Sequence, residues 1–153
     1  MKNEKSTNTV YLQGRVGSAV EYSHDLYGER FYEFKLNVPR LSEHLDVIPI
    51  TASEALVAGL QADELIAVSG QFRSFNRPDG ERSRLILSVF AREITQPQAE
   101  VNPNAAELIG YICKPPIYRT TPFNREICDV LLAVNRAYSK SDYIPCIAWG
   151  KNA

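Results

Sequence analysis

The sequence predicts an all-β chain: one complete five-stranded barrel followed by the first three strands of a second. Two observations lead to this prediction. Segments of alternating apolar and polar residues, typical of half-buried strands, run through the chain. The first of these segments also recur at a constant offset of 96 residues. The 153 residues, 44% of them hydrophobic, suit a globular protein with one substantial core and part of another.

The internal repeat is the most informative feature of the sequence. The offset places Gly110 on Gly14 and needs no gap. Three stretches match their counterparts: 10–16 with 106–112, 36–40 with 132–136, and 46–49 with 142–145. Three matches at a single offset favour a duplicated unit over chance.

The order of elements in the first copy indicates its fold. Alternating residues predict strands over 10–16, 32–38 and 46–52. A short helix is expected over 53–59, capped by Ser53 and ended by Gly59. Two further β-rich runs, 65–72 and 84–90, are joined by a turn at 76–80. Three strands, a helix and two strands is the order of the OB-fold, a five-stranded Greek-key barrel.

The repeat also predicts the domain organisation. We expect a complete OB-fold over 1–95, a polar, proline-bearing linker over 96–105, and a truncated OB-fold half over 106–153. Half a barrel exposes apolar faces and an open edge. Three explanations stay open: a shortened chain, strands supplied by another chain, or a half-sheet that packs on the first domain.

Composition excludes several classes of function. The net charge of -1 means that any nucleic-acid binding must be local. Neither a secretory signal nor a membrane span is visible in the sequence, so no membrane partner is expected. The spacing of the three cysteines matches neither a CxxC pair nor a paired disulfide framework, which indicates a reduced, cytoplasmic protein. His24 and His44 are isolated, so no metal site is expected. No catalytic or cofactor-binding motif is present, so we expect no enzyme, no cofactor and no small-molecule substrate.

Two motifs in the second copy point to a family. AVNRAY at 133–138 and SDYIPCIAWGK at 141–151 resemble the second- and third-strand signature of bacterial single-stranded DNA-binding proteins, and GQFRSF at 70–75 is similar to their fourth strand. The resemblance implies a tandem OB-fold relative that stacks bases of a single strand on aromatic side chains along a basic groove. It places Tyr138, Tyr143 and Trp149 at stacking positions, with Phe75 near another.

The residues support this interpretation independently. Tyr143 and Trp149 are six positions apart and share one face of a strand, whereas Ile144, Cys146 and Ala148 share the other. Aromatic side chains on an outward face indicate a binding surface. Candidate phosphate contacts beside this stripe are Arg136, Lys140 and Lys151, and a residual contact in the first copy would use Arg73, Phe75, Arg77 and Arg84.

The two copies differ where binding would occur. At the positions of Tyr138, Tyr143 and Trp149 the first copy has Ser42, Val47 and Ser53. We therefore expect the first copy to act mainly as a scaffold and the second to carry the stronger site.

The predicted function is largely sequence-independent binding of single-stranded DNA in replication, repair or recombination, by a homo-oligomer. RNA uses the same stacking physics and stays open. An alternative is an OB-fold protein-interaction or assembly module of the replication machinery. Tyr143 and Trp149 would then be core or subunit-contact residues. Arg77 and Arg84 can also be interpreted as solvated turn charges.

Overall fold

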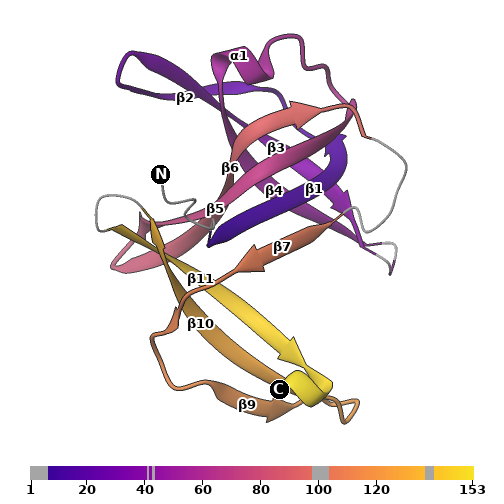
Figure 1. The fold of residues 1–153 in the computed structure, drawn as a ribbon, viewed down its shortest axis with the longest axis vertical. Helices are drawn as coiled ribbons and strands as arrows, with labels where there is room; N and C mark the ends of the chain where they lie inside the picture. Colours follow the sequence, from indigo (N-terminus) through magenta and orange to yellow (C-terminus); the bar gives the residue numbers. More distant parts are fainter. Residues whose placement is uncertain (1–6, 41, 43, 98–103, 137–139) are drawn as a thin grey trace, which may run out of the picture.

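The computed structural model describes residues 7–40, 42, 44–97, 104–136 and 140–153, which form a seven-stranded and a four-stranded sheet (Figure 1). The first part of the chain contains β1 (Asn8–Val16), β2 (Glu21–Leu26), β3 (Glu29–Pro39), β4 (Leu45–Ser53), α1 (Glu54–Val57), β5 (Leu65–Asp79) and β6 (Arg82–Thr95). The second part contains β7 (Ala105–Leu108), β8 (Tyr111–Ile112), β9 (Ile117–Thr120), β10 (Glu126–Arg136), β11 (Lys140–Trp149) and the 3-10 helix η1 (Gly150–Asn152).

Five strands of the first part close into a barrel. Strand β1 pairs with β5 along most of its length and with β3 at its end, through Arg15 and Val16. Strands β3 and β4 form one antiparallel pair and β5 and β6 another. Strand β4 then pairs in parallel with β6, where Ile50 lies opposite Val89. The ring β1, β3, β4, β6, β5 is therefore complete, and the predicted OB-fold is confirmed.

The predicted alternation places the core inside this barrel. Phe34 is 1% exposed and Leu36 is 0% exposed, while the intervening Lys35 faces solvent. The buried cluster is Val10, Leu12, Val16, Phe34, Leu36, Val38, Ile50, Ala52, Val57, Ile66, Val68, Val89 and Ala91. Because these residues come from all five strands and α1, the core depends on the closed ring.

The helix is shorter than the sequence predicts. It covers only Glu54–Val57, and Ser53 occupies the N-cap position without a side-chain capping hydrogen bond. The expected serine cap is therefore wrong: Ser53 is still the last residue of β4, and the helix is a single turn. Gly59 does follow the helix with a positive φ of 82°, as its predicted terminating role requires.

The duplication is visible in the strand pairing. We call residues 8–95 repeat 1 and residues 104–153 repeat 2. Three pairs of repeat 1 recur in repeat 2 with both partners shifted by 96: Leu36–Ile48 as Leu132–Ile144, Arg15–Asn37 as Tyr111–Ala133, and Tyr22–Tyr32 as Tyr118–Cys128. The two repeats thus share one strand register at these pairs.

One glycine is required at the same place in each repeat. A Cβ at Gly14 would collide with the Asn37 carbonyl oxygen, and a Cβ at Gly110 would lie 2.5 Å from the Ala133 carbonyl oxygen. Each pair is the counterpart of the other at the 96-residue offset. Glycine allows the strand to cross its neighbour closely at these points.

Replacing Gly14 by alanine should lower the free energy of unfolding by about 1–3 kcal/mol, because the added methyl group must displace backbone. Urea denaturation followed by circular dichroism measures the change. Gly28→Asn is the matched control: nothing lies within 4 Å of a Cβ there, and asparagine tolerates its φ of 79°. Equal losses in both variants would contradict the steric explanation.

Repeat 2 divides the counterpart of β1 into two strands. Strand β8 stays in its own sheet by pairing with β10, whereas β7 pairs antiparallel with β1 and lies alongside it (Figure 1). Val10 stands opposite Ala106, which is its own counterpart, so the two strands are related by a local two-fold axis. The repeats therefore share a sheet, and the division of the chain at residues 95 and 106 stays a prediction.

Candidate functional site

Strand β11 presents one face to solvent and turns the other inward. Tyr143 is 44% exposed, Ile147 53% and Trp149 52%. On the opposite face Asp142 is 0% exposed and Ile144 4%. This alternation confirms the predicted outward orientation of Tyr143 and Trp149. At roughly 3.3 Å per residue, the two rings are attached about 20 Å apart along the strand.

A second tyrosine lies beside Tyr143. Ala133 of β10 pairs with Tyr143 on one side and with Tyr111 of β8 on the other. Directly paired residues project from the same face of a sheet. Tyr111 is 71% exposed, so two solvent-facing rings flank a small residue at a separation of about 10 Å, which is two strand spacings. We call Tyr111, Tyr143, Ile147 and Trp149 the aromatic face.

Sequence reasoning missed Tyr111. Its counterpart in the first copy, Arg15, falls at an outward position of the first predicted strand. The repeat therefore already indicated that the Tyr111 side chain points outward. Only the register of three adjacent strands shows that Tyr111 and Tyr143 lie in one row.

The β5–β6 hairpin of repeat 1 reaches the start of β11. The Ser74 backbone N–H donates to Asp142 Oδ1 at 2.9 Å, and the Tyr143 backbone N–H donates to Ser74 Oγ at 2.7 Å. Phe75, the next residue of β5, is 45% exposed, and the Arg77 guanidinium lies 5.9 Å from the centre of its ring. The structure thus brings the predicted residues Phe75, Arg77 and Tyr143 to one junction between the repeats.

Asp142 is the centre of this junction. Its Oδ2 lies 3.5 Å from Arg73 Nη1 and 3.6 Å from Arg136 Nε, and the Asp142 side chain is 0% exposed. Burial lowers the pKa of Arg73, and the charges of Arg136 and Arg92 act in the same direction, while Asp142 opposes them. One buried carboxylate therefore faces two arginines, one from each repeat, and this cluster keeps a net positive charge.

The counterpart pair in repeat 1 is arranged differently. Arg40 donates through Nε and Nη2 to both oxygens of Asp46 at 2.6–2.9 Å, and the side chains are 59% and 41% exposed. The hydrogen bond from Arg40 lowers the pKa of Asp46. The same sequence pair is thus a surface contact in repeat 1 and part of a buried junction in repeat 2.

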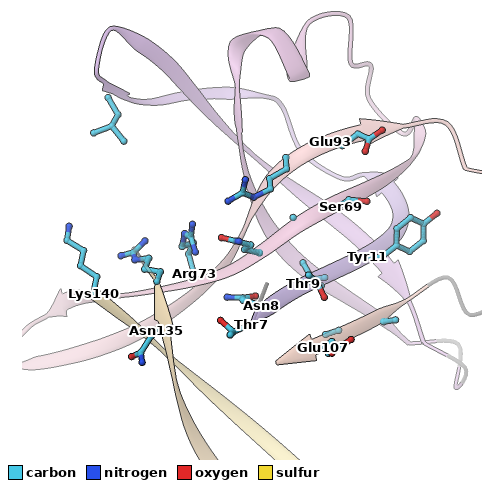
Figure 2. Close-up of a pocket in the computed structure, with 18 of the residues that line it drawn as sticks. Thr7, Asn8, Thr9, Tyr11, Ser69, Arg73, Glu93, Glu107, Asn135 and Lys140 are labelled. Atoms are coloured by element: carbon cyan, nitrogen blue, oxygen red, sulfur yellow. The ribbon is translucent and has the colours of Figure 1, made fainter. Parts of the chain in front are cut away.

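A groove of about 1710 Å³ runs beside the junction. Figure 2 shows Arg73, Asn135 and Lys140 at one end of it, where β10 and β11 approach β5. Polar side chains of β1 and β7, including Asn8, Thr9 and Glu107, line the other end. Positive charge therefore gathers at the end that faces the junction.

The remaining predicted residues are spread over the surface. Arg84 of β6 pairs with Arg77 across the hairpin. Lys140 begins β11 and Lys151 lies in η1, and both are exposed. Tyr138 lies outside the described residues. Arg73 and Arg136, which were predicted to contact phosphate, both face Asp142.

The described part of the chain shows no cluster of three or more His, Cys, Asp or Glu side chains that could hold a metal ion. Cys113, Cys128 and Cys146 are free thiols, and burial raises the pKa of Cys146. Among the helices in the described ranges, none has the length and apolar character needed to cross a bilayer.

The chain is similar to known proteins in sequence and in fold. The model of the single-strand binding protein family matches residues 103–153, which include the whole aromatic face. The dimeric N-terminal domain of PriB protein from Thermoanaerobacter tencongensis is 47% identical to the chain over 100% of that domain and 61% of this chain, with a TM-score of 0.52. The chain belongs to the single-strand binding protein family.

The arrangement of both repeats is found in another solved structure of this fold. Wild-type single-stranded DNA-binding protein from Thermus aquaticus is similar over 94% of this chain and 74% of that chain, with 21% identity and a TM-score of 0.68. This likeness extends over both repeats of the present member of the single-strand binding protein family. None of the curated proteins gives a match.

Proposed function

We propose that the chain binds single-stranded DNA on the aromatic face, by stacking bases on Tyr111, Tyr143 and Trp149 and by contacting phosphates with lysine and arginine side chains. The observation that carries the proposal is the outward row of half-exposed aromatic rings on a sheet whose alternate residues are packed. Each stacked base contributes about 1–3 kcal/mol, and every base has a π-face, so binding would be largely independent of sequence.

Basic residues border the aromatic face at several points. Lys140 and Lys151 lie at the two ends of β11, while Arg77 and Arg84 lie on the hairpin that carries Phe75. Arg73 and Arg136 add positive potential at the junction although both face Asp142. A strand that crosses from Phe75 to Tyr143 and on to Trp149 would meet cations on both sides.

Titration with oligo(dT) tests this function. Trp149 is the single tryptophan of the chain, so a stacked base should quench the tryptophan fluorescence directly. With three or four phosphate contacts, the logarithm of affinity should fall with the logarithm of salt concentration at a slope between about -2 and -3. Unchanged fluorescence, together with no mobility shift at low salt, would contradict the proposal.

Replacing Tyr111 by alanine should weaken oligo(dT) binding by between about fivefold and 150-fold, because one stacking surface is lost. The quenching titration measures the change, since Trp149 is retained. Phe123→Ala is the control: Phe123 is 89% exposed but lies in the turn between β9 and β10. If both variants bind as the parent does, Tyr111 has no part in the site.

A second function, an interaction or assembly module of the replication machinery, is favoured by a different observation. Strand β11 is the edge of its sheet in the described part of the chain, and beyond Tyr143, whose N–H donates to Ser74, this edge pairs with no other strand there. Exposed sheet edges pair readily with other polypeptides. In that case Trp149→Ala would change the oligomeric mass and leave DNA affinity nearly intact. Mass photometry and the DNA titration together separate the two functions.

We extend the proposal to the cellular setting and assembly of the chain. It would act without catalysis, in the cytoplasm, as a homo-oligomer during replication, repair or recombination, and its two repeats would form separate OB units joined through residues 96–105. The PriB domain to which it is similar is described as dimeric, which supports self-association. Competition between oligo(dT) and oligo(U) would establish the preference for DNA or RNA.

A further inference from the structure

A β-bulge in repeat 1 gives Arg92 a position of its own. The register of β5 and β6 shifts between Ser69 and Gly70, which pair with Glu93 and Ala91 respectively. Arg92 is therefore the extra residue of β6 at this point. A bulge bends its strand and redirects a side chain, and bulges are frequent beside functional sites. The Arg92 side chain is exposed and lines the groove of about 1710 Å³ beside the junction.

Three more cationic side chains line this groove. Arg73 comes from β5 in repeat 1, while Arg136 and Lys140 come from β10 and β11 in repeat 2. Arg73 and Arg136 both lie within 3.6 Å of one oxygen of Asp142. Lys140 is the cross-strand partner of Arg136, and Figure 2 shows it at the same end of the groove as Arg73. The basic cluster, as we call it, consists of Arg73, Arg92, Arg136 and Lys140.

Acidic side chains do not balance the charge of the basic cluster. Within the described ranges Asp142 is its one ion-pair partner, and it serves Arg73 and Arg136 together. Burial lowers the pKa of Arg73, and the charges of Arg136 and Arg92 lower it further. Cations that are held close together repel one another and attract an anion. The cluster therefore has an excess of positive charge, although the whole chain carries a net charge of -1.

Asp142 fixes the direction of two members of the cluster. Its Oδ2 faces Nη1 of Arg73 and Nε of Arg136, and both of these nitrogen atoms are buried. The two side chains nevertheless keep 20% and 33% of their surface exposed. Each guanidinium has further N–H donors, so the donors that do not face Asp142 are available to a ligand.

The groove also reaches the edge of the aromatic face. Asn135 pairs with Ser141, which is two residues before Tyr143, so Asn135 projects from the face that carries Tyr143. Arg136 and Lys140 project from the opposite face. Because Asn135 and Arg136 both line the groove, it passes around the start of β11 from one face of the sheet to the other.

We propose that the basic cluster binds phosphate groups and that a bound phosphate bridges the two repeats. Each repeat supplies two of the four cations, so a ligand held among them adds a contact across the junction. The phosphate comes either from the backbone of the strand bound on the aromatic face or from a free compound such as pyrophosphate. The first source rests on the proposed function, and the second does not.

The chemistry of the cluster favours phosphate over the carboxylates of an acidic polypeptide. Three of its cations are arginines, and a guanidinium binds phosphate oxygens in bidentate fashion. Adjacent phosphate groups of a nucleic-acid backbone or of pyrophosphate can meet cations of both repeats at once. Figure 2 shows Glu93 and Glu107 away from Lys140, where they would repel a longer polyanion. The site therefore suits a short stretch of backbone or a small phosphate compound.

Pyrophosphate tests the site without DNA. We expect it to slow hydrogen exchange of the Ser74 and Tyr143 amides, whose hydrogen bonds cross the junction, because a ligand bound across the junction opposes its opening. Arg92→Gln and Lys140→Gln should each weaken pyrophosphate binding at least about fivefold in calorimetry, since a charge-assisted hydrogen bond is lost. Both side chains are exposed, so circular dichroism should stay unchanged.

Oligo(dT) tests the strand as the source. If its backbone occupies the cluster, the double variant of Arg92 and Lys140 should reduce the steepness of the salt dependence by about 1.4, which corresponds to two phosphate contacts. Quenching of Trp149 at saturation should persist, because the stacking surface is retained. Arg125→Gln is the matched control: it removes the same charge from the turn between β9 and β10, and it should leave both ligands bound as in the parent.

The outcomes separate the sources and the two proposals. Loss of pyrophosphate binding with an unchanged salt dependence supports a site for a free phosphate compound, and the reverse supports the strand. Variants that bind both ligands as the parent does would overturn the inference, as would an equal loss in Arg125→Gln. Absence of Trp149 quenching in the parent would contradict the proposed function, whereas pyrophosphate binding would still support the basic cluster as a phosphate site.

Discussion

Replacing Tyr143 and Trp149 together by alanine should weaken binding of oligo(dT) by between about 30-fold and 10⁴-fold. Each ring contributes about 1–3 kcal/mol to stacking, and the two rings are far enough apart along β11 for their losses to add. Because the double variant lacks the tryptophan signal, binding is best measured by anisotropy of labelled DNA. Circular dichroism should stay unchanged, since both side chains are about half exposed.

Tyr27→Asn is the matched control for this double variant. Tyr27 is 99% exposed at the turn between β2 and β3, and asparagine tolerates its φ of 51°. Its replacement should leave DNA binding unchanged. Equal weakening in the control and the double variant would show that the loss is not specific to the aromatic face.

Replacing Asp142 by alanine should lower the free energy of unfolding by about 3–5 kcal/mol, because it leaves Arg73 and Arg136 facing each other without a buried counter-charge. It also removes the acceptor of the Ser74 N–H. Urea denaturation measures the loss. We expect the junction to open first, so that hydrogen exchange at Ser74 and Tyr143 accelerates before the barrel of repeat 1 unfolds.

The repeat provides a control for Asp142. Its counterpart Asp46 pairs with Arg40 at 2.6 Å, which is shorter than the distances of 3.5 and 3.6 Å from Asp142 to its two arginines. Both side chains of the Asp46 pair are nevertheless exposed. Because solvent screens this pair, Asp46→Ala should have little effect on stability. If Asp46→Ala lowered the free energy of unfolding as much as Asp142→Ala does, the effect would come from the Arg–Asp pair within each hairpin. The junction between the repeats would then not account for it.

The double alanine variant of Tyr143 and Trp149 and the Asp142→Ala variant separate DNA binding from the stability of the junction. The aromatic variant should lose DNA affinity at constant stability. Asp142→Ala should lose stability first, and its DNA affinity should fall only to the extent that Phe75 and Tyr143 move apart. Comparing both measurements in both variants therefore tests whether the junction serves the site.

Much of the fold could be predicted from local pattern. The alternation around Phe34 and Leu36 predicted a buried strand face, and the matches around Gly14 and Gly110 predicted a duplicated unit. Both hold because a strand repeats every two residues, so a face can be recognised without its partners. The serine cap at Ser53 was wrong because a capping preference is weak and the adjoining strand extends to that residue.

The site could be predicted only in part. The outward orientation of Tyr143 and Trp149 follows from their even spacing, which the sequence displays. Tyr111 joins them only through the pairing of β8 and β11 with the same residue of β10. The role of Asp142 was also hidden, because its partners Arg73 and Ser74 are about 70 residues away and in the other repeat.

Sequence alone therefore determined the five barrel strands of repeat 1, the duplication and the outward face of β11. The strand faces follow from neighbours within a few residues, and the duplication follows from matching segments. Tertiary structure alone decided that β7 joins the sheet of repeat 1, that Asp142 is buried while Asp46 is exposed, and that Arg92 and Lys140 line one groove. The physical reason is that similar local sequences enter different surroundings. Whether a residue is buried, which charge it pairs with and whether a strand edge is free depend on the parts of the chain that pack against a segment. They do not depend on the sequence of the segment itself.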